Sequence, residues 1–113
     1  MNEAKKKHTF VICAYKESSY LEECVKSLKN QNQLSNILMV TSTPNEYIEK
    51  ISRKYGIELK INTGQGGIVQ DWNFAYRQCK TPYITIAHQD DVYFKDYAAR
   101  AIKMLEQSRK PLI

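Results

Sequence analysis

The chain has 113 residues, of which 42% are hydrophobic and 26% are charged. This length and balance fit one globular domain with its own core, and they exclude a low-complexity or disordered chain. No apolar run is long enough to span a membrane, and the lysines near the start are not followed by the apolar segment of a secretory signal, so we expect a cytoplasmic protein.

The formal net charge of +5 would suit an anionic ligand or a nucleic acid. Several positive charges, however, fall at the start of the chain or on outward faces of the expected helices, where a solvated surface is the better interpretation. No basic stripe is interleaved with aromatic residues, so we expect no nucleic-acid partner. Residues 1–7 are interpreted as a flexible basic N-terminus and residues 8–113 as a single domain.

The three cysteines lie inside apolar patterns and not at the spacings of metal or redox sites. Cys13, Cys24 and Cys79 are therefore interpreted as small buried hydrophobic residues in a reducing compartment.

The first expected strand, residues 8–15, lacks polar alternation, which predicts a strand covered on both faces of a parallel sheet. Ser19 and Glu22 have the spacing of a capping box and predict a helix from there to about Asn30. Its apolar positions share one face: Leu21, Cys24, Val25 and Leu28.

Residues 36–42 form the second expected strand. Thr43 is expected to cap a second helix, with Pro44 at its first position and Glu46 at its third. Gly56 is expected just after the end of this helix, where glycine is common. Its expected core face consists of Tyr47, Ile48, Ile51 and Tyr55.

The remaining segments continue the alternation of strands and helices. We expect a short edge strand at 58–61, a glycine-containing loop at 62–67, a helix at 68–78, a strand at 83–87 and a last helix from Asp96 to near Ser108. Residues 111–113 resemble the beginning of another strand, so we expect the chain to be the first part of a longer protein.

This alternation predicts an α/β fold, a three-layer α/β/α sandwich with a mainly parallel sheet. Right-handed crossovers predict the strand order third, second, first, fourth, which is that of half a Rossmann-like domain.

The strand at 83–87 runs directly into His88, Gln89, Asp90 and Asp91. Two adjacent carboxylates repel each other, and a divalent cation such as Mg²⁺ or Mn²⁺ would neutralise them. A metal there would in turn attract a diphosphate. The alternative is that Asp90 and Asp91 only open a turn or cap the next helix.

Residues that follow the other strands should meet at the same edge of the sheet. Tyr15 could pack on a nucleobase or simply cover the sheet edge, whereas a capping role is favoured for Thr43. His88 is either a ligand to the metal or substrate, or a neutral histidine hydrogen-bonded at the strand end. The glycines of the 62–67 loop do not form a dinucleotide-binding or Walker sequence.

Several of these segments together resemble the family 2 glycosyltransferases. The first strand and helix, Phe10-Val11-Ile12-Cys13-Ala14-Tyr15-Lys16-Glu17 and Tyr20-Leu21-Glu22-Glu23-Cys24, are similar to the opening of that family. Gly67 and Asn73 are similar to the Gly and Asn that bracket the family's Ala-Arg-Asn-x-Gly helix. Residues 83–91 are similar to its strand that ends in Asp-x-Asp-Asp, and the resemblance covers nearly all of residues 8–108.

The resemblance implies a GT-A domain that holds a nucleotide diphosphate sugar, usually uridine-linked, for inverting transfer to an acceptor. It implies that Tyr15, Glu17, Thr41, Ser42 and His88 line the nucleotide site. Asp90, with Asp91 beside it, would contact Mn²⁺ or Mg²⁺. The family's catalytic base lies beyond Ile113, so the resemblance gives no catalytic residue here.

The chain departs from the family pattern at several positions. Thr41 and Ser42 stand where the family has an acidic pair, one of which commonly reads the nucleotide base. His88 stands at the first aspartate of Asp-x-Asp, and Trp72 replaces the usual arginine. The alternative is a non-catalytic α/β module, either a degenerate transferase or a receiver-like domain. A receiver needs acidic residues after the first strand, and residues 13–16 supply none.

Overall fold

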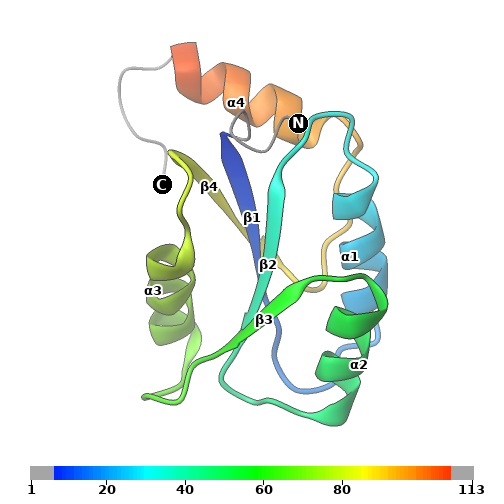
Figure 1. Cartoon of the computed structure of the whole chain (residues 1–113), viewed down its shortest axis with the longest axis vertical. Coiled ribbons are helices and arrows are strands. Elements are labelled where there is room, and N and C mark those ends of the chain that lie inside the picture. The colour runs from blue at the N-terminus through cyan, green and yellow to red at the C-terminus, as the bar shows by residue number, and fades with distance from the viewer. Residues whose placement is uncertain (1–6, 108–113) are drawn as a thin grey trace.

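A computed structural model describes residues 7–107 of the chain. Strands and helices alternate throughout (Figure 1). The elements are β1 (His8–Cys13), α1 (Leu21–Lys29), β2 (Asn36–Thr41), α2 (Glu46–Lys54), β3 (Glu58–Ile61), α3 (Ile68–Gln78), β4 (Tyr83–His88) and α4 (Tyr97–Gln107). The strand expected at residues 111–113 lies outside the described residues.

The four strands form one parallel sheet in the order β3-β2-β1-β4, which confirms the predicted order. In the centre of the sheet, Val11 pairs with Leu38 on one side and with Ile86 on the other. Because all four strands run in the same direction, their carboxyl ends share one edge, where ligands of such sheets bind.

Helices cover both faces of the sheet, with α1 and α2 on one side and α3 on the other (Figure 1). Side chains of β1 alternate between two cores. Phe10 and Ile12 join the larger cluster with α1, α2 and Ala98 of α4, whereas Val11 packs with Val40 and Ala75 under α3. The three-layer α/β/α sandwich is therefore confirmed.

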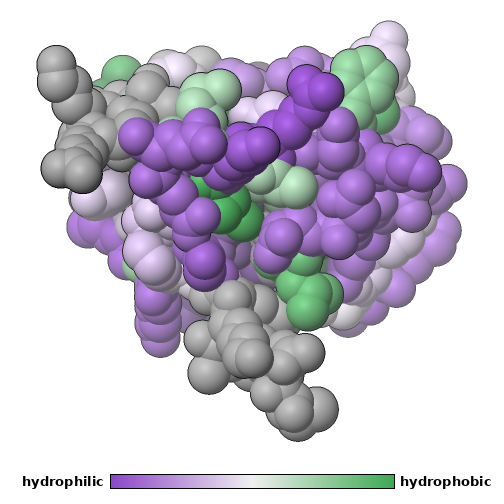
Figure 2. All heavy atoms as spheres, turned by 90° about the horizontal axis from the view of Figure 1, so that it is seen from above, coloured by the Kyte–Doolittle hydropathy of each residue, from purple (hydrophilic) through white to green (hydrophobic). Residues whose placement is uncertain are grey.

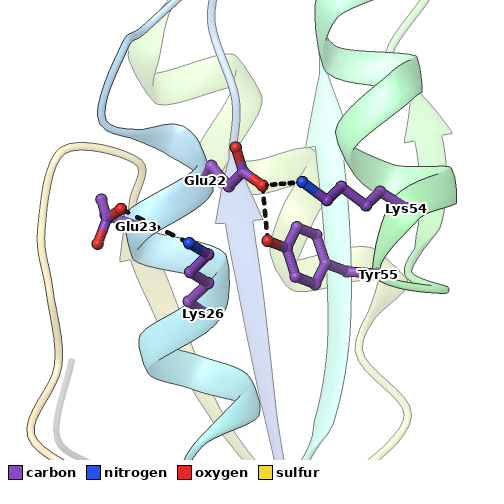
Figure 3. A network of polar contacts seen from close by, with 5 residues as sticks. All are labelled: Glu22, Glu23, Lys26, Lys54 and Tyr55. Carbon is purple, nitrogen blue, oxygen red and sulfur yellow. Dashed lines mark hydrogen bonds and ion pairs between the residues drawn. The ribbon is translucent and has the colours of Figure 1, made fainter.

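The start of α1 differs from the prediction. The residue before the helix is Tyr20, which makes no side-chain cap, so the expected capping box of Ser19 and Glu22 is wrong. The Glu22 carboxylate instead accepts hydrogen bonds from Lys54 Nζ and the Tyr55 hydroxyl, both at 2.6 Å (Figure 3). These contacts join α1 to α2, and they lower the pKa of Glu22, the bond from Lys54 contributing most.

The cap of α2 also differs from the prediction. Asn45, and not Thr43, caps this helix, because its Oδ1 accepts the backbone N–H of Ile48 at 2.9 Å. Thr43 Oγ1 accepts the backbone N–H of Lys16 at 2.7 Å, so it connects two loops. Gly56 follows the helix with a φ of +63°, as expected for a glycine in that position.

His8 is completely buried at the start of β1. Its Nδ1 lies 2.9 Å from Ser35 Oγ and its Nε2 lies 2.7 Å from Thr85 Oγ1, so both ring nitrogens have hydroxyl partners. Burial lowers the pKa of His8 from 6.5 to about 4, because a charged imidazolium is poorly solvated there. The ring is therefore neutral at physiological pH.

Figure 2 shows the side of the molecule on which α4 lies in Figure 1, and its surface is mostly hydrophilic with small separate hydrophobic groups. A surface of this kind lacks the contiguous apolar patch that marks many docking sites. Over residues 7–107, none of the helices combines the length and the apolar character needed to cross a membrane.

Candidate functional site

A cavity of about 420 Å³ opens at the carboxyl ends of β1 and β4. Three segments line it: the end of β1, the beginning of α3 and the turn after β4. The lining residues are Cys13, Ala14, Tyr15, Gly67, Asp71, Trp72, His88, Gln89 and Asp90. This is the edge at which the sequence predicted a site.

A second hollow, of about 560 Å³, lies near the opposite ends of the strands and is lined by Thr9, Asn36 and Glu58 together with several basic side chains. None of the predicted site residues lines it. The cavity at the carboxyl edge is therefore the candidate site.

Tyr15 and Gln89 connect the ends of β1 and β4 across the floor of the site. The backbone N–H of Tyr15 donates to Gln89 Oε1 at 2.9 Å, and Gln89 Nε2 donates back to the Tyr15 carbonyl at 3.1 Å. The Tyr15 side chain stays 48% exposed, with the Lys16 ammonium 5.1 Å from its ring centroid. A fixed backbone thus presents an accessible aromatic ring.

Lys16 has a φ of +54° in the turn after β1. Its N–H donates to Thr43 Oγ1, and its carbonyl accepts Asn45 Nδ2 at 3.0 Å. A left-handed conformation is costly for a residue with a Cβ, so these two contacts hold a strained turn at the rim of the site.

Asp90 is held from the loop between β1 and α1. The Ser18 hydroxyl donates to Asp90 Oδ1 at 2.6 Å, and Ser18 Oγ also accepts the backbone N–H of Tyr20 at 3.2 Å. Among the described residues, these contacts give Asp90 one hydrogen-bond donor and leave its other oxygen available to a ligand.

The turn that follows β4 is anchored on α1. Tyr93 donates its backbone N–H to Ser27 Oγ at 3.0 Å, and its hydroxyl accepts the backbone N–H of His88 at 3.2 Å. Burial raises the pKa of Tyr93 to about 12, so the phenol stays neutral. The Cys24 thiol contacts the His88 carbonyl at 3.4 Å, and burial likewise raises the pKa of Cys24 to about 12.

Another wall of the cavity comes from α3. Trp72 meets the His88 ring edge to face, with 5.9 Å between the ring centroids. The apolar spacing predicted this helix but not its orientation. Asp71 and Ala75 are buried, and Phe74 packs with Ala75 on the sheet, whereas Val69, Trp72 and Tyr76 are exposed.

Asp71 is a site residue that the sequence analysis missed. The residue is 7% exposed. One carboxylate oxygen accepts a hydrogen bond from Ser42 Oγ at 3.1 Å, and the other accepts one from Asn62 Nδ2 at 3.2 Å. A signal was present in the sequence: Asp71 comes three residues after Ile68 and four before Ala75. This spacing places the acid on the same helix face as these two apolar residues, and so toward the sheet. Ser18 and Trp72 were also absent from the predicted site, whereas Gln89 belongs to residues 88–91, which were expected at this edge.

The predicted site residues divide into two groups. Tyr15, His88 and Asp90 line the cavity. The others do not line it: Glu17 and Asp91 are exposed, Ser42 is half-buried against Asp71, and Thr41 is 1% exposed. The Thr41 hydroxyl accepts the backbone N–H of Thr43 at 3.0 Å. Burial and this local bond explain why Thr41 does not line the cavity.

The acidic side chains of the site suit a metal ion held jointly by the protein and a bound phosphate better than an ion enclosed by protein ligands alone. Among residues 7–107, no three His, Cys, Asp or Glu side chains converge as a metal site would need. Mg²⁺ is often held by one or two carboxylates together with substrate phosphates and water. Asp90, with a carboxylate oxygen available, fits that kind of binding.

The comparison with protein families decides the classification. The family model of glycosyl transferase family 2 matches residues 9–112. The chain belongs to this family. No curated protein matches the chain in sequence.

Several solved structures share the fold of this chain. The chain is similar to S. aureus TarS, with a TM-score of 0.74, 19% identity and coverage of 89% of this chain and 20% of TarS. For TarS 1-349 the TM-score is 0.73, with 21% identity and coverage of 89% of this chain and 32% of that one.

The third structure is the mannosyltransferase PcManGT from Pyrobaculum calidifontis in complex with GDP-Man and Mn²⁺. Its TM-score is 0.75, with 19% identity and coverage of 95% of this chain and 33% of that one. The chain thus spans 20 to 33% of the lengths of these structures. At such identities the likeness establishes the fold, and the predicted GT-A fold is confirmed.

Proposed function

We propose that this chain forms the donor-binding part of a glycosyltransferase that uses a nucleotide diphosphate sugar. The observation that carries the proposal is the position of Asp90. In a domain of glycosyl transferase family 2, this carboxylate follows the carboxyl end of β4 and lines a cavity together with Tyr15 and Trp72. A cavity with aromatic walls and an acidic end suits a nucleotide that arrives with a cation.

Each side chain has a distinct role in this proposal. The exposed ring of Tyr15 offers a face for the nucleobase, and His88 with Trp72 closes the other wall. Glu17 and Ser42 are proposed to border this space, and Thr41 to support the loop that carries Ser42. Ser18 fixes the Asp90 carboxylate through its 2.6 Å hydrogen bond.

Asp90 is the proposed ligand of Mn²⁺ or Mg²⁺, with Asp91 adjacent to it. When bound, such an ion supplies positive charge that stabilises the diphosphate leaving group. The Mn²⁺ in the PcManGT complex supports this part of the proposal. Without a cation, the carboxylate and the diphosphate would repel each other.

The family resemblance favours uridine as the donor base, whereas PcManGT is in complex with GDP-Man. The proposal therefore requires a nucleoside diphosphate, and a direct comparison of UDP with GDP decides between them. Inverting transfer and an acceptor hydroxyl as nucleophile are the accompanying proposals for the reaction. The family match favours this function over a receiver-like module.

Isothermal titration calorimetry tests the proposal. UDP and GDP are titrated, each with and without Mn²⁺, into the chain and into Asp90→Asn. We expect metal-dependent binding that Asp90→Asn weakens at least tenfold, as for loss of a charged metal contact. Glu58→Gln is the matched control, because it removes a carboxylate at the opposite end of the sheet. Equal affinity in the chain and in Asp90→Asn would refute the role of Asp90.

A further inference from the structure

Asp71 is a carboxylate buried in the wall of the candidate site. It lies in the first turn of α3, it is 7% exposed, and it lines the same cavity as Asp90. A buried carboxylate is costly unless hydrogen bonds compensate for its lost solvation. Its surroundings therefore indicate what it is placed to bind.

Two neutral side chains hold Asp71 from the ends of other strands. Ser42, just after β2, donates to Oδ2, and Asn62, just after β3, donates to Oδ1. None of the ion pairs among residues 7–107 includes Asp71. An ionised carboxylate has about four acceptor positions, so two neutral donors leave it able to accept further hydrogen bonds from a ligand.

The loop before α3 fixes this arrangement. A Cβ on Gly66 would come within 3.2 Å of Ser42 Oγ, so the loop backbone packs closely on the Ser42 side chain. Gly67 has a φ of +120°, a conformation that side chains rarely permit. Ser42 therefore has little freedom to leave Asp71, and the carboxylate is held in one place.

The charges of the cavity determine how a nucleotide would lie in it. Asp71 has neutral partners, and its negative charge repels a phosphate. Asp90 is the carboxylate with an oxygen available to a cation, so the diphosphate belongs at its end. The base is then placed away from Asp90, between the aromatic side chains and the Asp71 acceptor.

We propose that Asp71 selects the nucleobase by accepting a hydrogen bond from a ring N–H. Uracil and guanine carry such a hydrogen on the Watson–Crick edge, whereas cytosine and adenine have an acceptor nitrogen at that position. This inference rests on the proposed function and specifies the class of donor. Asp71 acts on binding and not on the chemical step.

The test measures affinity for four ligands in the presence of Mn²⁺: UDP, GDP, CDP and ADP. CDP and ADP lack the ring N–H that would donate to the charged Asp71 carboxylate. We therefore expect UDP or GDP to bind roughly ten- to a hundredfold more tightly than CDP and ADP. The diphosphates of 3-methyluridine and 1-methylguanosine should lose this advantage, because each lacks the ring hydrogen. These ligands test the intact chain, so the result does not depend on a variant that folds poorly.

Asp71→Asn is the complementary variant, since its amide can both donate and accept. We expect UDP and CDP, or GDP and ADP, to bind this variant within about threefold of each other, because the amide can pair with either base edge. Glu58→Gln should keep the full preference. Circular dichroism confirms that each variant is folded.

The outcomes separate this inference from the proposed function. Binding of all four nucleotides with equal affinity, or a preference that survives in Asp71→Asn, would overturn the role of Asp71 while leaving a nucleotide site. Failure of every nucleotide to bind with Mn²⁺ would overturn the proposed function and this inference with it.

Discussion

The Ser18 hydroxyl donates a 2.6 Å hydrogen bond to Asp90 Oδ1, across 72 positions of sequence. This bond joins the loop after β1 to the turn after β4, which are neighbours because β1 and β4 pair in parallel. The carboxylate that is proposed to meet the metal is thus oriented by a residue from another strand.

Replacement of Ser18 tests this orientation. Ser18→Ala should weaken Mn²⁺-dependent nucleotide binding about three- to tenfold, because a hydrogen bond of about 1 kcal/mol no longer restrains the carboxylate. Ser18→Thr keeps the hydroxyl and should restore affinity. Calorimetry measures both, and an unchanged affinity in Ser18→Ala would show that Ser18 does not position Asp90.

The buried, neutral ring of His8 should make the folded chain less stable in mild acid. Above pH 6.5 the imidazole is neutral in both the folded and the unfolded chain. As the pH falls from 6.5 toward about 4, the unfolded chain takes up a proton that the folded chain excludes, so the free energy of unfolding falls. The loss attributable to this residue is about 3 kcal/mol at most, by the usual conversion of a pKa difference.

Urea denaturation of the chain and of His8→Gln between pH 7.5 and 4.5 checks this prediction. The glutamine does not titrate, so its stability should vary less with pH in this window than that of the unaltered chain. Parallel pH dependences would contradict the role of His8.

The left-handed turn at Lys16 gives a prediction about stability. Lys16→Gly should be at least as stable as the unaltered chain. Glycine removes the Cβ clash of this conformation, and this gain offsets the greater conformational entropy that glycine gives the unfolded chain. Lys16→Val should lose about 1 to 3 kcal/mol, because a β-branched residue tolerates this φ poorly. Midpoints of urea denaturation rank the variants, and a glycine variant less stable than valine would refute the argument.

The sequence predicted the elements well because their signals are local and repeated. The apolar runs of β1 and β4 and the glycine after α2 each follow from neighbouring residues. Parallel pairing and right-handed crossovers then restrict the strand order to the one observed.

Residues with competing partners were predicted poorly. Glu22 has the position of a capping residue, but Lys54 and Tyr55 bind its carboxylate from α2. Thr43 has the position of a helix cap, but Lys16 donates to it from another loop. A local motif does not reveal these tertiary partners, and the contacts of Ser18 and Asp71 were missed for the same reason.

The isolated chain should bind a donor without transferring its sugar at an appreciable rate. Transfer needs a base within reach of the acceptor hydroxyl, and loss of a positioned base costs on the order of a hundredfold to ten-thousandfold in rate. Near the cavity, within the part of the chain that the structure describes, the candidate proton acceptors besides Asp71 and Asp90 are His88, Glu17 and Asp91, all of them assigned to the proposed donor site.

Release of UDP or GDP from the corresponding nucleotide sugar, with and without simple sugar acceptors, checks this prediction. We expect no stimulation by an acceptor. Acceptor-dependent release that Asp90→Asn abolishes would require a catalytic base among the residues of this chain.

The central claim is that a divalent cation and a nucleoside diphosphate meet at Asp90. The most direct measurement is paramagnetic broadening of backbone amide NMR signals by Mn²⁺ with UDP or GDP, against Mg²⁺ as the diamagnetic control. The account predicts broadening at Ser18, Gln89, Asp90 and Asp91, with Glu58 unaffected at the other end of the sheet, and loss of this pattern in Asp90→Asn. Broadening centred elsewhere, or the same pattern in Asp90→Asn, would contradict it.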